Sequence, residues 1–389
     1  MNNYFEFNSG AKILCGEDAL NNLDYELEFF QAKNPLLLSD EGIVNAGLVA
    51  IVKQSVKAVK METEFFKIPA DSSTITINQI ARLYKNNKCD AIIAVGGGSV
   101  IDTAKGVKLL LSQDCENILE LSGNEIVKKG HLIPFIVIPT TCGTGSECTA
   151  VAVIKDAKTK TKLEFISSEL LPDVALLDPR MIKNLPPKIM ASTAIDALTH
   201  SIEAYSGLQK NALSDAYSTL AVKLISDNLL EALNGNEQSK AGLLLASNIA
   251  GTAFSNSMVG IVHAIGHALG AVAGVPHGCA MAILLPECLK FNLDYNYVEY
   301  SKLLLYFTNE DTFAYTKPNE RGKLFIEKIE EFLKNVKEKS NLMLKLSDYG
   351  VQEKDLIEIS EKAINDGASI INSKPFNRDD VLEILKAVF

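Results

Sequence analysis

Short apolar runs alternate with longer amphipathic stretches over the first 180 residues of the chain. This alternation is typical of βαβ units, in which helices cover a largely parallel sheet. The apolar runs predict strands at 36–38, 65–68, 91–95, 135–138 and 175–177, and the amphipathic stretches predict helices at 43–59, 75–86 and 100–111. Two more short runs, at 151–154 and 162–166, predict a hairpin.

The pattern changes near residue 180. The segments Asp178-Pro179 and Leu185-Pro186-Pro187 disfavour helix, and beyond them the chain shows helical periodicity with almost no strand signal. Helices are predicted at 191–205, 214–233, 242–255, 262–272, 279–291, 320–342, 353–365 and 378–388. We therefore expect an α/β domain over residues 1–180, followed by an all-helical domain over residues 181–389.

The composition limits the classes of protein to which the chain can belong. With 389 residues, 47% of them hydrophobic, it is long enough for two domains with sizeable cores. A formal charge of −10 argues against general binding to nucleic acid. Residues 241–286 carry no charged side chain, but polar residues, glycine and proline interrupt them. They predict buried helices of a folded domain and no membrane span.

Cysteine usage and the N-terminus indicate the cellular compartment. The seven cysteines are odd in number, scattered, and contain no C-x-x-C pair, so neither a disulfide framework nor a zinc ribbon is expected. The first residues show no basic region followed by an apolar one, as a secretory signal would. Both observations favour the cytoplasm.

A glycine-rich turn follows the predicted strand 91–95. Gly96, Gly97, Gly98 and Ser99 lead directly into the predicted helix 100–111. Glycines allow close approach of the backbone to a ligand, and a helix N-terminus offers unpaired N–H groups with a partial positive charge. A bound pyrophosphate explains this segment, but a tight turn with Ser99 as helix cap explains it equally well. The spacing is not G-x-G-x-x-G.

Two further features strengthen the case for a dinucleotide. A polar loop from Pro139 to Glu147 follows the strand 135–138, and its hydroxyls suit contacts with ribose, phosphate or the nicotinamide amide, although it could simply cap a helix. Both loops lie at the carboxyl ends of predicted parallel strands, where open α/β sheets bind ligands. Asp40 ends the strand 36–38, where a carboxylate can bind a ribose 2′-OH and repel a 2′-phosphate. This favours NAD over NADP, with helix capping as the alternative role.

Four of the five histidines lie in the predicted helical domain. Asp196 and His200 are four residues apart, as are His263 and His267, so each pair shares one helix face, and His277 follows shortly after. Burying so many ionisable groups is costly unless something pairs with them, and a divalent cation does so. Three imidazoles and one carboxylate suit Fe(II) or Zn(II) with an open position for a substrate oxygen. The residues alone do not choose between the two metals.

The order and spacing of these motifs identify a resemblance. The chain resembles the iron-containing (group III) alcohol dehydrogenases along nearly its whole length. The matching segments are Cys15-Gly16-Glu17, GGGSVID at 96–102, TTCGTGSE at 140–147, LLDP at 176–179, STAIDALTHSIEAY at 192–205, GTAFSN at 251–256, GIVHAIGHALG at 260–270 and PHGCAMAILLP at 276–286.

The resemblance implies a role for individual positions. Asp196, His200, His263 and His277 would be the metal ligands, and His267 would sit beside the substrate and pass protons outward. NAD would be contacted by Asp40, Gly97, Gly98, Ser99, Thr140, Thr141, Thr144 and Lys162, and Phe254 would line the pocket of a small alcohol or aldehyde. The family fold, a dinucleotide-binding domain packed on a helical domain with the active site in the cleft, commonly forms dimers or larger homo-oligomers.

The chain departs from the family pattern at several positions. Pro-Asn-Pro-Thr reads Pro69-Ala70-Asp71-Ser72, Met281 replaces an asparagine, Cys142 replaces an alanine, and a late Asn-Pro-Arg motif is replaced around residues 372–375. None of these changes removes a proposed ligand, but they leave the substrate and the nicotinamide contacts open.

Three alternatives remain at this point. A dehydroquinate-synthase-like lyase also combines NAD with a divalent metal, but it needs a cluster of basic residues that is not evident near the metal motifs. A glycerol-dehydrogenase-like enzyme would use zinc and usually three protein ligands. A non-catalytic metal- or nucleotide-binding protein is the third.

Overall fold

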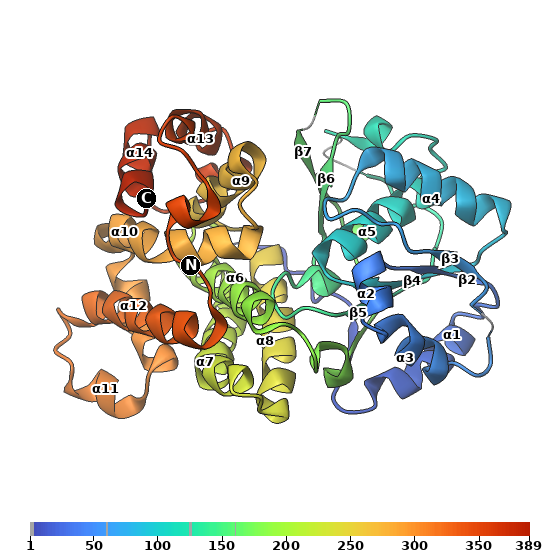
Figure 1. The fold of residues 1–389 in the computed structure, drawn as a ribbon, viewed down its shortest axis with the longest axis horizontal. Coiled ribbons are helices and arrows are strands. Elements are labelled where there is room, and N and C mark those ends of the chain that lie inside the picture. Colours follow the sequence, from blue (N-terminus) through green and yellow to red (C-terminus); the bar gives the residue numbers. More distant parts are fainter. Residues whose placement is uncertain (1–3, 60, 124–126, 160) are drawn as a thin grey trace. The chain divides into compact units, whose positions relative to one another are not determined.

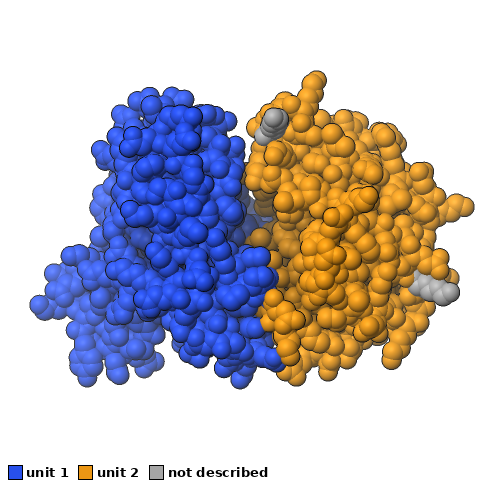
Figure 2. All heavy atoms as spheres, viewed as in Figure 1, with its two compact units in different colours: residues 1–7, 185–389 blue, residues 8–184 orange. Residues whose placement is uncertain are grey.

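The computed structural model describes residues 4–59, 61–123, 127–159 and 161–389. The chain divides into two compact units, coloured separately in Figure 2. Residues 8–184 form an α/β unit, and residues 1–7 together with 185–389 form a helical unit. In the helical unit, the ring of Phe7 packs against that of Tyr217 with 5.7 Å between centroids.

The α/β unit is built on a six-stranded parallel sheet with the order β1-β8-β5-β4-β2-β3. The strands are β1 (Lys12–Cys15), β2 (Pro35–Leu38), β3 (Thr63–Phe65), β4 (Ala91–Gly96), β5 (Phe135–Pro139) and β8 (Val174–Leu177). The strands β6 (Val151–Lys155) and β7 (Lys162–Ile166) form the predicted antiparallel hairpin. The expected parallel α/β architecture is confirmed.

Alternate residues of the central strands enter two separate cores. Ile92 and Ala94 of β4 pack with α4 (Thr74–Asn86) and α5 (Gly98–Ser112), whereas Ile93 and Val95 pack with α1 (Leu23–Phe29) and α3 (Leu48–Ser55). Figure 1 shows these helices on opposite faces of the sheet. Burial on both faces explains why β4 is an uninterrupted apolar run and was recognisable from the sequence.

Two predictions in this unit were wrong in detail, and one strand was missed. The single helix expected at 43–59 is two helices, α2 (Glu41–Asn45) and α3, because Gly47 between them has a φ of 78° that no helix residue adopts. The strand expected at 65–68 lies earlier, as β3. The strand β1 was missed, since it is a largely exposed edge strand without an apolar run.

The helical unit confirms the expected all-helical architecture within its described residues. Its helices are α6 (Pro187–Ser206), α7 (Ala212–Leu233), α8 (Glu237–Ser255), α9 (Ile261–Ala273), α10 (His277–Phe307), α11 (Glu310–Tyr315), α12 (Arg321–Ser340), α13 (Asp355–Ala363) and α14 (Arg378–Ala387). The helix expected at 279–291 continues to Phe307, with Pro286 inside it and a kink at Asn296, and α11 was not predicted.

The uncharged stretch 241–286 folds into most of α8, all of α9 and the start of α10. Most of its residues are buried in this unit. Among the helices that the structure describes, none combines the length and the hydropathy that crossing a membrane requires.

Candidate functional site

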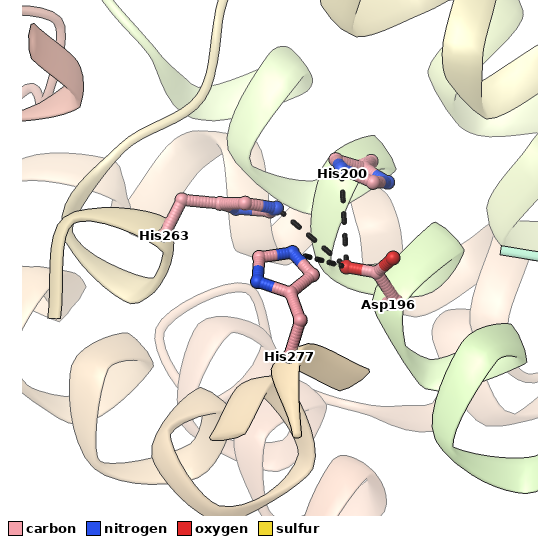
Figure 3. A group of neighbouring side chains, drawn as sticks. All are labelled: Asp196, His200, His263 and His277. Atoms are coloured by element: carbon pink, nitrogen blue, oxygen red, sulfur yellow. Dashed lines mark ion pairs between the residues drawn. The ribbon is translucent and has the colours of Figure 1, made fainter. Parts of the chain in front are cut away.

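Four side chains from three helices of the helical unit converge on one point (Figure 3). Asp196 and His200 lie on α6, His263 lies on α9, and His277 is the first residue of α10. One ligand atom from each residue lies within 4.8 Å of the others. The Nε2 atoms of His277, His263 and His200 lie 3.3, 3.6 and 3.8 Å from Oδ1 of Asp196. The structure therefore brings together the four residues that the resemblance implies as metal ligands.

The spacing of these atoms fits a shared cation better than direct hydrogen bonds. Charge-assisted N–H···O bonds are about 2.7–2.9 Å long. Two ligands of one tetrahedral cation, each bound at about 2.1 Å, stand about 3.4 Å apart. Oδ1 of Asp196 and Nε2 of His263 are buried and have no hydrogen-bond partner among the described residues. The donor set and these orphaned atoms fit Fe(II) or Zn(II).

The charges at this point favour a cation as well. Burial alone would raise the pKa of Asp196, but the imidazoles of His200, His277 and His263 hold it well below its ordinary value. Burial alone would lower the pKa of His263, but the carboxylates of Glu203 and Asp196 raise it to about 9. The buried negative charge of Asp196 thus creates a potential that a bound divalent cation would compensate.

Glu203, on the same helix as Asp196, orients His263. Its Oε2 accepts a hydrogen bond from Nδ1 of His263 at 2.5 Å, and its Oε1 accepts one from the backbone N–H of Val262 at 2.7 Å. Because Glu203 holds the Nδ1 proton, Nε2, the atom that faces Asp196, is the nitrogen that would lose its proton and bind a metal. The carboxylate therefore selects the ring tautomer that can bind a metal.

The start of α9 shows why this arrangement is possible. Gly260 is the N-cap, and no side chain of its own caps the helix. Instead the N–H of Ile261 donates to Oδ1 of Asn372 at 3.3 Å, while that of Val262 donates to Glu203. A Cβ on Gly260 would lie 2.9 Å from Oδ1 of Asn372 and 3.2 Å from Oε1 of Glu203. Glycine thus allows both acceptors to reach the helix start.

His267 lies one turn after His263 and stands beside the four-residue group. Its Nδ1 donates to Oδ2 of Asp366 at 2.9 Å, and its ring stacks with that of His277 at 5.5 Å between centroids. Asp366 also accepts from the N–H of Ala368 at the start of η7 (Gly367–Ile370). Burial alone would raise the pKa of Asp366, but its bond with His267 lowers it below the ordinary value. An imidazole held by an ionised carboxylate is suited to moving a proton.

Phe254, near the end of α8, contacts His200 of the candidate metal-ligand group. Its ring stacks on that of His200 with centroids 4.1 Å apart and planes at 16°. The side chain is partly buried. This position is compatible with the expected lining of a substrate pocket next to His200.

The glycine-rich turn between β4 and α5 and the loop after β5 form a second candidate site, here called the cradle (residues 97–99 and 140–144). Gly97 is the N-cap of α5, and no side chain caps this helix. A Cβ on Gly97 would lie 3.2 Å from Cγ2 of Thr141, and one on Gly98 would lie 3.0 Å from Cγ2 of Thr144. Glycines thus let the two loops pack together, and because no side chain caps α5, its first N–H groups are suited to bind an anion.

Two hydroxyls of the cradle differ in their contacts. The simpler explanation of the turn, in which Ser99 caps the helix, was wrong, because Ser99 lies inside α5 and its hydroxyl donates to the carbonyl of Ala70. Thr140 is held by its N–H, which donates to the carbonyl of Gly96 at 3.1 Å. Its Oγ1 is buried with no hydrogen-bond partner among the described residues, as expected of a group that binds a ligand.

Asp40 does cap a helix, which was the alternative to ribose binding. It is the N-cap of α2, and its Oδ1 accepts from the N–H of Ile43 at 2.9 Å. A carboxylate has two oxygens, however, so Oδ2 can accept from a ribose hydroxyl while the cap is in place. The two roles are compatible.

Lys162, expected to contact NAD, starts β7. Its Nζ lies 3.6 Å from Oδ1 of Asp71, in the segment that departs from the family pattern. Asp71, Glu203 and Asp366 are side-chain partners of the expected site residues that the sequence did not reveal. Glu203 follows His200 by three residues on α6, and this helical spacing could have pointed to it. Its partner His263 lies 60 residues away in the sequence, however, and Asp366 lies 99 residues from His267.

The chain is similar to known proteins over nearly its whole length. Residues 10–179 match the family described as iron-containing alcohol dehydrogenase, and residues 190–389 match the C-terminal part of the Fe-containing alcohol dehydrogenase family. An NADPH-dependent butanol dehydrogenase of Clostridium saccharobutylicum is 31% identical over 92% of each chain. A 1,3-propanediol dehydrogenase of Citrobacter freundii is 29% identical over 96% of each chain. The solved alcohol dehydrogenase from Oenococcus oeni superposes with a TM-score of 0.91, at 27% identity, over 99% of this chain and 100% of that one.

Proposed function

This chain belongs to the iron-containing alcohol dehydrogenase family of NAD(P)-dependent enzymes, and on that premise we propose that it exchanges a hydride between NAD(H) and a small primary alcohol or aldehyde. The observation that carries the proposal is the convergence of Asp196, His200, His263 and His277 with their ligand atoms within 4.8 Å. Burying four ionisable side chains at one point is energetically costly unless a cation compensates their charge.

The four ligands would hold Fe(II), with Zn(II) as the second choice. When bound, the cation supplies Lewis-acid stabilisation of a substrate alkoxide or carbonyl oxygen. The protein's own part is to fix the ligands, which Glu203 does for His263, and to move the proton. His267 accepts that proton on Nε2 during alcohol oxidation and returns it during aldehyde reduction, because its Nδ1 is held by Asp366.

The cradle would hold the dinucleotide. The first N–H groups of α5 at Gly98 and Ser99 suit the pyrophosphate, and Thr140, whose hydroxyl is buried without a partner among the described residues, suits a polar group of the cofactor. Thr141, Thr144 and Lys162 are further contacts that the family resemblance implies. Asp40 favours NAD over NADP, although the butanol dehydrogenase relative is NADPH-dependent. A higher kcat/KM with NADPH than with NADH would refute this choice.

Two further parts of the proposal concern the cell. We expect a cytoplasmic protein, since the odd, scattered cysteines suit a reducing compartment. We also expect a homodimer or a larger homo-oligomer, as the family resemblance implies. Sedimentation of the purified protein measures the assembly directly.

The test is an NADH assay with a panel of short aldehydes. The metal-stripped protein is reloaded with Fe(II) or Zn(II) in turn, and absorbance of NADH is followed with each aldehyde. Net, metal-dependent consumption of NADH supports the proposal. A lyase would recycle its cofactor and consume none, and a non-catalytic binding protein would show full metal and NAD occupancy without turnover. Either result refutes the proposal.

A further inference from the structure

A carboxylate lies between two lysines beside the cradle. Oδ2 of Asp71 is 3.1 Å from Nζ of Lys155, and Oδ1 is 3.6 Å from Nζ of Lys162. Lys155 and Lys162 are cross-strand partners in the β6–β7 hairpin. Like charges placed opposite one another destabilise a strand pair. Asp71 offsets this repulsion by giving each lysine one oxygen.

The segment around Asp71 is tied to the start of α5. The hydroxyl of Ser99 donates to the carbonyl of Ala70, and Oγ1 of Thr103 donates to Oγ of Ser72 at 3.0 Å. The N–H of Lys155 donates to the carbonyl of Ser72 at 2.8 Å, which joins the same segment to the hairpin. Asp71 and both lysines therefore stand near the helix end to which the pyrophosphate is assigned.

The charge of Asp71 is present under ordinary conditions. Burial alone would raise the pKa of this carboxyl, but Lys155 and Lys162 lower it below its usual value. About half of the Asp71 side chain and somewhat more than a third of each lysine is exposed to solvent. Without the carboxylate, the two ammonium groups would form an anion-binding pair at the edge of the cradle.

We propose that Asp71 is an internal counter-ion that occupies this lysine pair, weakens the hold on the dinucleotide and so speeds its release. This role rests on the proposed function, because it requires the cradle to bind NAD(H). The carboxylate acts in two ways: it neutralises one of the two lysine charges, and it repels the pyrophosphate across a partly solvated distance. Both effects raise the Kd of the nucleotide, and both weaken as salt screens them.

The test compares NADH binding by the full-length wild type and the variant Asp71→Asn, which keeps the shape and removes the charge. The Kd is measured from the fluorescence of NADH at low salt and at high salt. We expect Asp71→Asn to lower the Kd for NADH by about threefold to tenfold at low salt. The ratio of the wild-type Kd to the variant Kd should fall at high salt. The double variant Asp71→Asn/Lys162→Met should return the Kd towards that of the wild type.

The matched control is Asp114→Asn. Asp114 is an exposed carboxylate in the same unit, paired with His131 at 2.8 Å, and its replacement changes the net charge by the same amount. It should leave the Kd unchanged. If Asp71→Asn leaves the Kd unchanged or raises it while the wild type binds NADH, the counter-ion role is refuted and the proposed function stands. If the wild type binds no NADH at all, the proposed function itself fails.

Discussion

At the candidate metal centre the charges belong to side chains, whereas at the cradle they belong mainly to the backbone. The first site gathers two carboxylates and three imidazoles from three helices, all within the helical unit. The second uses glycines to bring two loops together and leaves the N-terminus of α5 without a side-chain cap. A site of buried side chains needs a ligand to compensate its charge, but a site of N–H groups can remain hydrated.

The difference predicts different responses to substitution. Removing one side chain from the metal centre removes a ligand and leaves uncompensated charge, so the effect is large. At the cradle, changes that displace the backbone should matter most, and the loss of a single side chain should have a smaller effect. The following experiments test this contrast, from the largest expected effect to the smallest.

The largest effect is expected for His263→Ala. This change removes one of four ligands and leaves Glu203 buried without its imidazole partner. We expect loss of bound metal and a fall in kcat of more than about a thousandfold. Metal content by elemental analysis and turnover with NADH are the measurements. His131→Ala, an exposed histidine paired with Asp114, is the matched control. Full metal content in His263→Ala would remove His263 from the ligand set.

His267→Ala should separate proton transfer from metal binding. His267 lies outside the four-atom group, so metal content and the Kd for NADH should stay unchanged. Loss of a positioned proton-transfer group should lower kcat by about a hundredfold. Asp366→Asn should give a smaller fall, because it disturbs only the bond at Nδ1. Loss of metal in His267→Ala would contradict this division of roles.

Glu203→Gln should weaken the metal site without removing a ligand. The glutamine oxygen can still accept from Val262, but its amide then donates to Nδ1 of His263 and drives the ring proton to Nε2. We expect a metal affinity about 10-fold to 100-fold lower, measured by competition with a chelator. Glu327→Gln, on an exposed part of α12, is the control. An unchanged affinity would mean that Glu203 has no part in orienting His263.

Gly98→Ala tests the packing of the cradle. The added Cβ would stand 3.0 Å from Cγ2 of Thr144 and push the two loops apart. We expect the Kd for NADH to rise about tenfold, with metal content unchanged. The double variant Gly98→Ala/Thr144→Ser removes the methyl group in question and should recover most of the affinity. Failure to recover it would show that this contact is not the cause.

The smallest effect is expected at Asp178, a buried charge that already has partners. It accepts from Arg180 and from the N–H of Leu20. Burial alone would raise its pKa, but these partners lower it below the ordinary value of about 3.9. The carboxyl of Asp178 therefore binds a proton more readily in the unfolded chain than in the folded protein. As a result, Asp178 stabilises the fold above about pH 4, and this contribution is lost as the pH falls further.

We expect Asp178→Asn to lower the free energy of unfolding by about 1–2 kcal/mol at pH 7. Below about pH 4, the difference in this free energy between the variant and the wild type should disappear. Denaturant unfolding across this pH range is the measurement. If this difference in the free energy of unfolding does not change with pH, the loss of stability comes from altered hydrogen-bond geometry and not from the lost charge.

The sequence predicted elements well where a local pattern determines them. The buried strand β4 is one apolar run, and Asp196 and His200 share a helix face because they are four residues apart. The same spacing at His263 and His267 did not show that only His263 faces Asp196, since that depends on the packing of α9. Glu203 and Asp366 were missed because their partners are distant in the chain. The exposed strand β1 has no apolar run to detect.

The path of the chain through the two units has a consequence for how they are joined. Residues 4–7 belong to the helical unit, although residues 8–184 form the α/β unit, so the chain leaves the helical unit and returns to it. The sheet-bearing unit is therefore an insertion with two covalent tethers, and Phe7 anchors one of them on Tyr217. With two tethers, a cut at either junction alone leaves the α/β unit covalently joined to the helical unit through the other.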